Sequence, residues 1–414
     1  MTVPVGAALD LEKYDDARQA WRCPALTTRT AGPGDEEVRA GTVVRLDGEA
    51  HKLRRRAMGA LLSRGGHKYF RDVHLFPTAD AALAAAMGHP DDRGFAHLEV
   101  RSWGRRVNQQ LAAALVGFDD AISPEGADEL FDLVERFIRG YQGVFENAFN
   151  PYQASGEVQR ASLAARDEML EKFYEPALAR RRQLVAQVKA GELEESELPQ
   201  DLLMLIAAGR DPAWADDALA KREAIFLLGA GVHTTANSLV WTLRELFAYF
   251  AEHPDAEARR NDEDFLFGAA CEALRLHPVT AGFVRRAESD VDLPSGIQIP
   301  AEALVVIRNG PAATEASVFG DDAAQFNPDR EVGKKVPRYG LAFGAGPHMC
   351  FGLPLVMGAE GLDGSLMYLL QILMRAGAAP DPAAPSSPMG PTRGRHDADA
   401  KKQPLNVLLP VTGA

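Results

Sequence analysis

The residues of this 414-residue chain that are best suited to chemistry stand in one short stretch around Cys350. Starting at Phe343, this stretch reads FGAGPHMCFG. Gly344, Gly346 and Pro347 predict a tight loop in which the backbone can approach a ligand closely. Such a loop can direct N–H groups at the cysteine sulfur, and these hydrogen bonds tune a bound thiolate. The stretch is therefore a candidate ligand-binding loop, although a lone cysteine is more often a buried apolar side chain.

The kind of ligand follows from what stands near the cysteine in the sequence. A zinc site needs several protein ligands, and only His348 is a second candidate close by. Cys23 and Cys271 lie too far along the chain for a CxxC zinc motif or a disulfide framework. A single thiolate on a glycine-rich loop is what haem iron requires, because the porphyrin supplies four other ligands. The residues favour haem over zinc.

A second pattern pairs opposite charges on one predicted helix. Glu272 and Arg275 are three residues apart, so both side chains fall on the same helix face. An isolated exposed pair of this kind contributes only a few tenths of a kcal/mol. If Arg330 joins the pair in a buried network, the loss of one partner costs about 3–5 kcal/mol. We expect a structural role for these three residues.

Together these patterns resemble the cytochrome P450 family of haem-thiolate monooxygenases. The family signature Phe-x-x-Gly-x-x-x-Cys-x-Gly is matched at Phe343, Gly346, Cys350 and Gly352. The pair of Glu272 and Arg275 fits the family's Glu-x-x-Arg helix, and residues 326–330 resemble the segment that supplies a second arginine. His51 and Arg55 resemble the family's His-x-x-x-Arg helix, and residues 285–287 look like another propionate-binding segment. The resemblance runs in the family's order over roughly residues 45–365.

The resemblance implies that the chain binds haem b and that Cys350 is the axial ligand of the iron. The haem propionates are anions, for which side chains of the matching segments are candidate donors of charge-assisted hydrogen bonds. These candidates are His51, Arg55, Arg285 and His348. The remaining implied haem contacts come from the loop itself, at Phe343, Gly344, Gly346 and Gly352.

The family's long central helix carries small residues, an acid and a threonine beside the bound oxygen. This chain reads AGVHTT from Ala230 to Thr235. By resemblance, Ala230 and Gly231 leave room for dioxygen and substrate, and Thr234 hydrogen-bonds the distal oxygen. A threonine in a helix otherwise most often bonds the carbonyl four residues earlier.

The position that the family usually fills with Asp or Glu is His233 in this chain. A histidine titrates near pH ~6.5 and can relay protons as an acid does. Alternatively, His233 is a packing residue and water alone delivers the protons. A third alternative is that one of its nitrogens reaches the iron in the resting state.

The function implied by the resemblance is insertion of one atom of O2 into a small apolar organic substrate. Electrons would come from NAD(P)H through a separate ferredoxin and reductase, because the chain has no flavin or Rossmann fingerprint. The His233 departure keeps a peroxide-driven or otherwise atypical enzyme as an alternative. A catalytically silent haem-binding scaffold is an alternative from another class of protein, although Cys350 is retained.

These residues require elements to position them, and the sequence predicts mostly helices. Apolar residues at steps of three, four and seven predict one long helix over residues 217–252, about 50 Å in length at about 1.5 Å per residue. Its buried face would hold Leu228, Val232, Leu239, Leu243, Leu246 and Phe250. Asp216 or Asp217 would cap its start, and His253-Pro254 would end it.

Strand signals are short. Residues 42–46, 303–307 and 405–411 have the apolar or β-branched character of strands, and the proline-rich residues 376–391 predict a loop. The predicted class is mainly α with a minor β part, built as a single cytochrome P450 domain over residues 1–414. Its N-terminal region, about residues 1–45, looks shortened, because residues 14–17 resemble the family's early helix.

Composition limits the class of partner. The chain carries 45 Lys and Arg against 58 Asp and Glu, a formal charge of −13, which argues against a nucleic-acid binder. We expect no membrane segment, no secretory signal and a cytoplasmic location. Residues 51–71, here called the basic stretch, contain seven Lys and Arg and no acid, so this segment is positively charged although the whole chain is negative. This stretch is either a solvated helix face or a dock for an anionic partner such as a ferredoxin.

Overall fold

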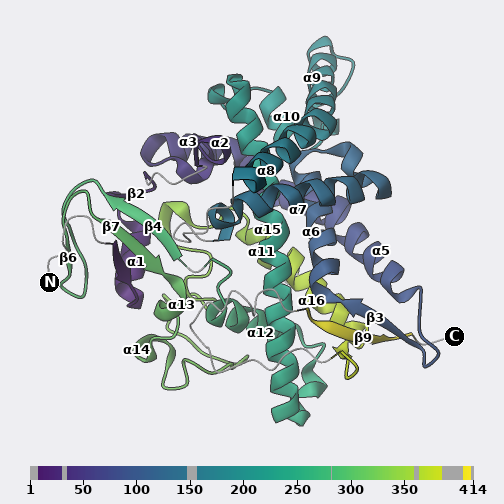
Figure 1. The fold of residues 1–414 in the computed structure, drawn as a ribbon, viewed down its shortest axis with the longest axis vertical. Coiled ribbons are helices and arrows are strands. Elements are labelled where there is room, and N and C mark those ends of the chain that lie inside the picture. Colours follow the sequence, from purple (N-terminus) through teal and green to yellow (C-terminus); the bar gives the residue numbers. More distant parts are fainter. Residues whose placement is uncertain are drawn as a thin grey trace. The chain divides into compact units, whose positions relative to one another are not determined.

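The computed structural model describes residues 8–29, 35–146, 156–280, 282–358, 363–384 and 404–411. Helices make up most of this part of the chain and the strands are short, which confirms the predicted mainly α class with a minor β part (Figure 1). Residue contacts divide the chain into two compact units. Unit 1 comprises the described residues of 1–26, 76–107 and 233–414, and unit 2 those of 27–75 and 108–232. The single domain expected from the sequence stays a prediction.

The described α-helices are α1 (Tyr14–Arg22), α2 (Asp35–Val38), α3 (Gly48–Met58), α4 (Arg64–Tyr69), α5 (Phe76–Met87), α6 (Val100–Val116), α7 (Pro124–Glu146), α8 (Gly156–Met169), α9 (Glu175–Ala190), α10 (Leu202–Ala207), α11 (Asp217–Glu252), α12 (Glu263–Leu276), α13 (Asn309–Ala312), α14 (Ala316–Phe319), α15 (Leu353–Met357) and α16 (Ser365–Arg375). The described strands are β1 (Ala8–Leu11), β2 (Leu26–Thr27), β3 (Phe95–Glu99), β4 (Gly282–Ala287), β5 (Val291–Asp292), β6 (Gln298–Ile299), β7 (Leu304–Arg308), β8 (Ala379–Pro380) and β9 (Asn406–Pro410). Short 3₁₀ and π turns connect several of these elements.

The long helix predicted over residues 217–252 is confirmed as α11, with the same bounds. Asp216 caps it, because its side-chain oxygen accepts the backbone N–H of Ala218 at 3.0 Å. The apolar face predicted from the sequence is buried along its whole length. By length and composition alone α11 could cross a membrane, but 61% of its most apolar window is buried inside the protein. Burial of this kind is the property of a core helix.

The sheet of unit 1 has the strand order β1-β7-β4-β2. Strand β7 confirms the strand predicted at residues 303–307; it pairs in parallel with β1 and antiparallel with β4. Helix α1 packs its buried face, which includes Tyr14, Ala17 and Trp21, into the same apolar cluster as the inward side chains of β7. Strand β1 precedes α1 in the N-terminal region, which the sequence predicts to be shortened.

A second sheet of unit 1 has the order β3-β9-β8. Strand β9 confirms the strand predicted at residues 405–411 and pairs antiparallel with β3 and β8. The predicted loop at 376–391 holds the two-residue strand β8, and its residues 385–391 lie outside the described part of the chain.

The strand predicted at residues 42–46 is wrong. Residues Val43–Arg45 form a 3₁₀ turn instead. The Val43 N–H donates to the Glu223 carboxylate of α11 at 3.0 Å. This side chain therefore accepts the hydrogen bond that a neighbouring strand would accept in a sheet. The β-branched residues were a correct signal of burial at Val43, but a tertiary hydrogen bond decided the backbone conformation.

Candidate functional site

The cysteine loop, residues 343–352, has the tight turns that its glycines predict. Gly344 and Gly346 both have φ +68°, a left-handed conformation that glycine adopts without steric cost. The backbone N–H of Cys350 donates to the carbonyl of Phe343 at 2.8 Å and closes the loop. Helix α15 begins directly after Gly352. The side chain of Cys350 is exposed, so its sulfur can be reached by a ligand.

The other two cysteines have different environments. Cys271 is buried in the middle of α12, and burial raises the pKa of its thiol to about 12. Cys23 follows the end of α1 and is half-buried against the apolar cluster of unit 1. A thiolate ligand must lose its proton and reach its metal. Cys350 is the one of the three that combines exposure with a glycine-rich loop.

Trp21 of α1 contacts the cysteine loop from one side. A Cβ added to Gly344 would lie 3.2 Å from two atoms of the Trp21 ring, so only a glycine lets the loop approach so closely. At Gly346 an added Cβ would lie 3.1 Å from the Trp21 carbonyl oxygen. The indole N–H donates to the Oδ1 of Asn309 at 3.2 Å, which fixes the orientation of the ring. Trp21 is not among the predicted site residues, although it lies seven residues after Tyr14 and four after Ala17, on the same helix face.

The predicted propionate donor Arg285 lies over the same ring. Its guanidinium carbon is 4.9 Å from the Trp21 ring centroid, a cation–π contact. Phe283 meets the Trp21 ring edge-on at 4.6 Å, and all three side chains come from α1 and β4 of unit 1. His348, the other predicted donor of this unit, is half-buried at the end of the short turn Gly346–His348. The structure thus brings the cysteine loop and Arg285 together through Trp21.

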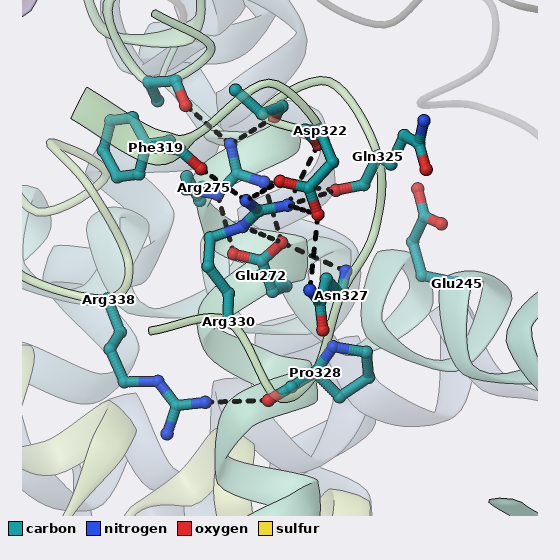
Figure 2. A network of polar contacts seen from close by, with 12 residues as sticks. Glu245, Glu272, Arg275, Phe319, Asp322, Gln325, Asn327, Pro328, Arg330 and Arg338 are labelled. Atoms are coloured by element: carbon teal, nitrogen blue, oxygen red, sulfur yellow. Dashed lines mark hydrogen bonds and ion pairs between the residues drawn. The ribbon is translucent and has the colours of Figure 1, made fainter. Parts of the chain in front are cut away.

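The predicted charge network is present and buried. Arg275 donates from Nε and Nη2 to both oxygens of Glu272, each at 2.7 Å, and Arg330 donates to the same carboxylate at 3.0 Å. Figure 2 shows the Glu272 carboxylate between the two guanidinium groups. The exposed fractions of Arg275, Glu272 and Arg330 are 0%, 2% and 5%. A bidentate, fully buried pair of this kind holds a fixed geometry.

The network ties the segment before the cysteine loop to α12. Arg275 also donates to the carbonyls of Ala313 and Ala323, and Arg330 donates to the carboxylate of Asp322 at 2.6 Å (Figure 2). Gly340 has φ +59°, and an added Cβ would lie 3.3 Å from the Cγ of Arg275. These hydrogen bonds satisfy the buried guanidinium groups and hold the segment that leads into the cysteine loop against α12.

The oxygen-side residues predicted from the sequence lie in α11 as expected. Ala230, Gly231, His233 and Thr234 are all half-buried. A Cβ on Gly231 would lie 3.1 Å from the Cβ of Ala112 in α6, so close helix packing also accounts for this glycine. The Thr234 carbonyl accepts the hydroxyl of Ser238 at 3.0 Å.

The predicted haem contacts of unit 2 lie on α3. His51 is buried and Arg55 is half-buried. Their neighbour Arg54 is buried as well; it donates to Asp211 at 2.5 Å and to Glu223. Arg54 is therefore not part of a basic face. Asp72, just beyond the basic stretch, pairs with Lys68 at 2.5 Å and with Arg71 at 2.7 Å.

The donor set fits a haem. An exposed thiol stands on a rigid glycine loop, and the buried cation Arg285 lies next to that loop through a shared tryptophan. Among the described residues no group of three His, Cys, Asp or Glu side chains could hold a bare metal ion. Haem brings the porphyrin ligands of its iron and carries two carboxylates. A single accessible sulfur with nearby cations therefore suits this cofactor.

Comparison with known proteins agrees with this chemistry. The family model of cytochrome P450 matches residues 155–358. Cytochrome P450 734A6 of Oryza sativa subsp. japonica is 26% identical over 311 residues, which is 66% of this chain and 55% of that protein. Cytochrome P450 monooxygenase sphH of Aspergillus fumigatus is 28% identical over 203 residues, 41% of this chain and 36% of that protein. The chain thus spans about half or less of these relatives.

Solved structures share the fold over nearly the whole chain. The crystal structure of CalO2 has a TM-score of 0.69 at 20% identity and covers 99% of this chain and 94% of that one. P450BioI, solved in complex with an acyl carrier protein ligated to hexadec-9Z-enoic acid, has a TM-score of 0.67 at 18% identity and covers 98% and 95%. At these identities the similarity establishes the fold.

Proposed function

Because this chain belongs to the cytochrome P450 family, whose cofactor is haem b, we propose that it is a haem-thiolate monooxygenase. It would insert one oxygen atom of O2 into an apolar organic substrate and release the other as water, with two electrons and two protons consumed. The single observation that supports this proposal best is the exposed Cys350 on a loop fixed by Trp21 and preceded by the Glu272 network.

The residues of the chain would hold and orient the cofactor. Haem, when bound, supplies the iron that activates dioxygen. Cys350 would ligate the iron through Sγ, and loop N–H groups would stabilise its negative charge. Arg285 and His348 of unit 1 would donate charge-assisted hydrogen bonds to the propionates. For His51 and Arg55 the same role is what the resemblance implies.

On α11, Thr234 would donate a hydrogen bond from Oγ1 to the dioxygen substrate. His233 occupies the position of the family's acid, and its ring nitrogen would pass a proton towards the same place. We expect His233→Ala to slow oxygen activation and to increase peroxide release. Unchanged coupling of electrons to product in this variant would remove His233 from the mechanism.

The test of the main proposal is the carbon-monoxide difference spectrum of the reduced, purified protein. We expect a thiolate-type band in the wild type and in Cys23→Ala, a half-buried cysteine outside the loop. Cys350→Ala should lose the band. A wild-type protein that binds haem without a thiolate-type band would contradict the proposal and favour a silent haem-binding scaffold.

A peroxide-driven enzyme is the second candidate, because His233 replaces the usual acid. Such an enzyme would form product with hydrogen peroxide alone, and it would need neither NAD(P)H nor a redox partner. Product formation with peroxide at the rate of the complete electron-transfer system would favour this candidate. A much slower peroxide reaction would favour the monooxygenase.

We further propose that electrons arrive from NAD(P)H through a reductase and a ferredoxin-type protein, since the sequence has no flavin fingerprint of its own. The proposed docking surface is the basic stretch without Arg54, which is buried. Its exposed cations are Lys52, Arg56, Arg64 and Lys68. A cytoplasmic location is supported by the low number of cysteines.

A further inference from the structure

Arg54 lies on the buried face of α3, between the predicted haem contact His51 and Met58. These three side chains are the buried residues of the helix, and they recur at steps of three and four along it. Only 2% of Arg54 is exposed, although an arginine is almost never fully buried unless it is paired. Its burial therefore requires partners from other segments of the chain.

Two carboxylates and one carbonyl of unit 2 satisfy the guanidinium group of Arg54. Its Nε donates to Asp211 at 2.5 Å, and its Nη1 donates to Glu223 of α11. Nη1 also donates to the carbonyl of Gly41 at 3.2 Å. The guanidinium carbon lies 5.2 Å from the ring centroid of Trp214, a cation–π contact. Charge-assisted hydrogen bonds of this kind are strong and directional, so they fix Arg54 against α11.

The same network holds the backbone that leads into α3. Glu223 is 0% exposed, and while one of its oxygens pairs with Arg54, the other accepts the backbone N–H of Val43 at 3.0 Å. Gly41, whose carbonyl accepts Arg54, has φ +73°, and an added Cβ would lie 3.1 Å from the Cδ1 of Leu219 in α11. Arg54 and Glu223 therefore tie both α3 and the segment before it to α11.

We propose that Arg54 is a positioning residue of the haem site. Its bonds to Glu223 and Asp211 set the position of α3, and a helix carries its other side chains with it. A displacement at Arg54 would move His51, one turn away, and Arg55, the next residue. This inference rests on the proposed function, in which the resemblance assigns His51 and Arg55 to the propionates. The family's His-x-x-x-Arg pattern leaves the residue at Arg54 unspecified.

The experiment compares Arg54→Met with Arg181→Met in the haem-loaded protein. Arg181 of α9 is the matched control, because it is also buried in unit 2 and also pairs with two aspartates, Asp119 and Asp201. We expect both variants to lower the melting temperature, whereas only Arg54→Met should lose haem to apomyoglobin about tenfold faster or more. Only Arg54→Met should shift the propionate bending bands of the resonance Raman spectrum, which report hydrogen bonds to the propionates.

Glu223→Gln is a milder variant that tests the same network if Arg54→Met does not fold. It keeps the shape of the side chain and an acceptor for the Val43 N–H, but it removes the charge that faces Arg54. We expect haem loss about threefold faster and a smaller shift of the same bands. Asp201→Asn removes a buried charge from the Arg181 network and should leave the rate of haem loss and the propionate bands unchanged.

Two results would each overturn the inference. The first is equal haem loss in Arg54→Met and Arg181→Met at equal loss of melting temperature, and the second is wild-type propionate bands in both Arg54→Met and Glu223→Gln. The carbon-monoxide difference spectrum separates this failure from failure of the proposed function. Arg54→Met should keep the thiolate-type band, because Cys350 belongs to unit 1, outside the network. A wild type without the band would contradict the proposed function, whatever the rates of haem loss.

Discussion

Among single residues, Trp21 contacts two separate parts of the proposed haem site. Its ring faces Gly344 of the cysteine loop, stacks under Arg285 and is fixed by Asn309. The loop and the arginine come from segments about sixty residues apart, and each has the same indole as a neighbour. A change in the ring should therefore affect both the thiolate ligand and a propionate donor.

We expect Trp21→Ala to speed the loss of haem and to diminish the thiolate-type band, with an accompanying loss of stability of about 3–5 kcal/mol typical of a buried tryptophan. Trp21→Phe, which keeps a ring but not the bond to Asn309, should be intermediate. Haem transfer to apomyoglobin and the reduced carbon-monoxide spectrum measure the effect. Trp103→Ala is the control, a buried tryptophan of α6. Equal spectral losses in both alanine variants would mean that Trp21 acts only through global stability.

At the scale of elements, β3 is connected to two loops by a histidine. The Nδ1 of His97 lies 3.0 Å from Asp381 and its Nε2 lies 3.2 Å from Asp91. Hydrogen bonds to Asp91 and then to Asp381 raise the pKa of His97 above its usual 6.5. Bonds from the backbone N–H of Phe95 and from neighbouring side chains hold the pKa of Asp91 well below its usual range.

The raised pKa sets a direction for the pH dependence of stability. The protonated His97 stabilises the fold fully below its unfolded-state pKa of about 6.5, and this contribution disappears as pH rises through the higher folded-state value. We expect His97→Gln to lower the melting temperature at mildly acidic pH and to match the wild type at alkaline pH. His89→Gln, an exposed histidine before the same strand, should show no such trend. A pH-independent difference for His97→Gln would contradict the assignment.

The Glu272 network acts at the same scale, because it joins α12 to the chain that leads into the cysteine loop. Glu272→Gln removes the charge that two buried arginines share, and we expect a loss of about 3–5 kcal/mol in the free energy of unfolding. Urea denaturation measures it. Asp264→Asn, an exposed acid in the first turn of the same helix, should change stability by less than about 0.5 kcal/mol. A small effect of Glu272→Gln would show that carbonyl acceptors alone satisfy the arginines.

At the scale of the whole molecule, the charge of −13 opposes the approach of an acidic redox partner. The basic stretch is the local exception, weakened by the burial of Arg54 and by the acid Asp72. The exposed cations that remain define a smaller attractive surface than the sequence indicates.

We expect the rate of electron transfer from an acidic ferredoxin to fall as salt concentration rises, because salt screens the attraction. Arg56→Glu should slow the reaction several-fold at low salt and flatten this dependence. Stopped-flow reduction of the haem measures both. Arg210→Glu makes the same charge change outside the basic stretch and serves as the control. A flat salt dependence in the wild type would remove the basic stretch as the docking surface.

Features that depend only on neighbouring residues follow from local sequence patterns. The period of α11, the glycines of the cysteine loop and the spacing of Glu272 and Arg275 are of this kind, so their outcome could be predicted. Other features depend on long-range contacts. The burial of Arg54, the turn at Val43 in place of a strand and the contact of Trp21 with Gly344 all join segments that are distant in sequence. Such contacts depend on which faces of distant elements pack together in the folded core, and no local pattern of residue types specifies this packing.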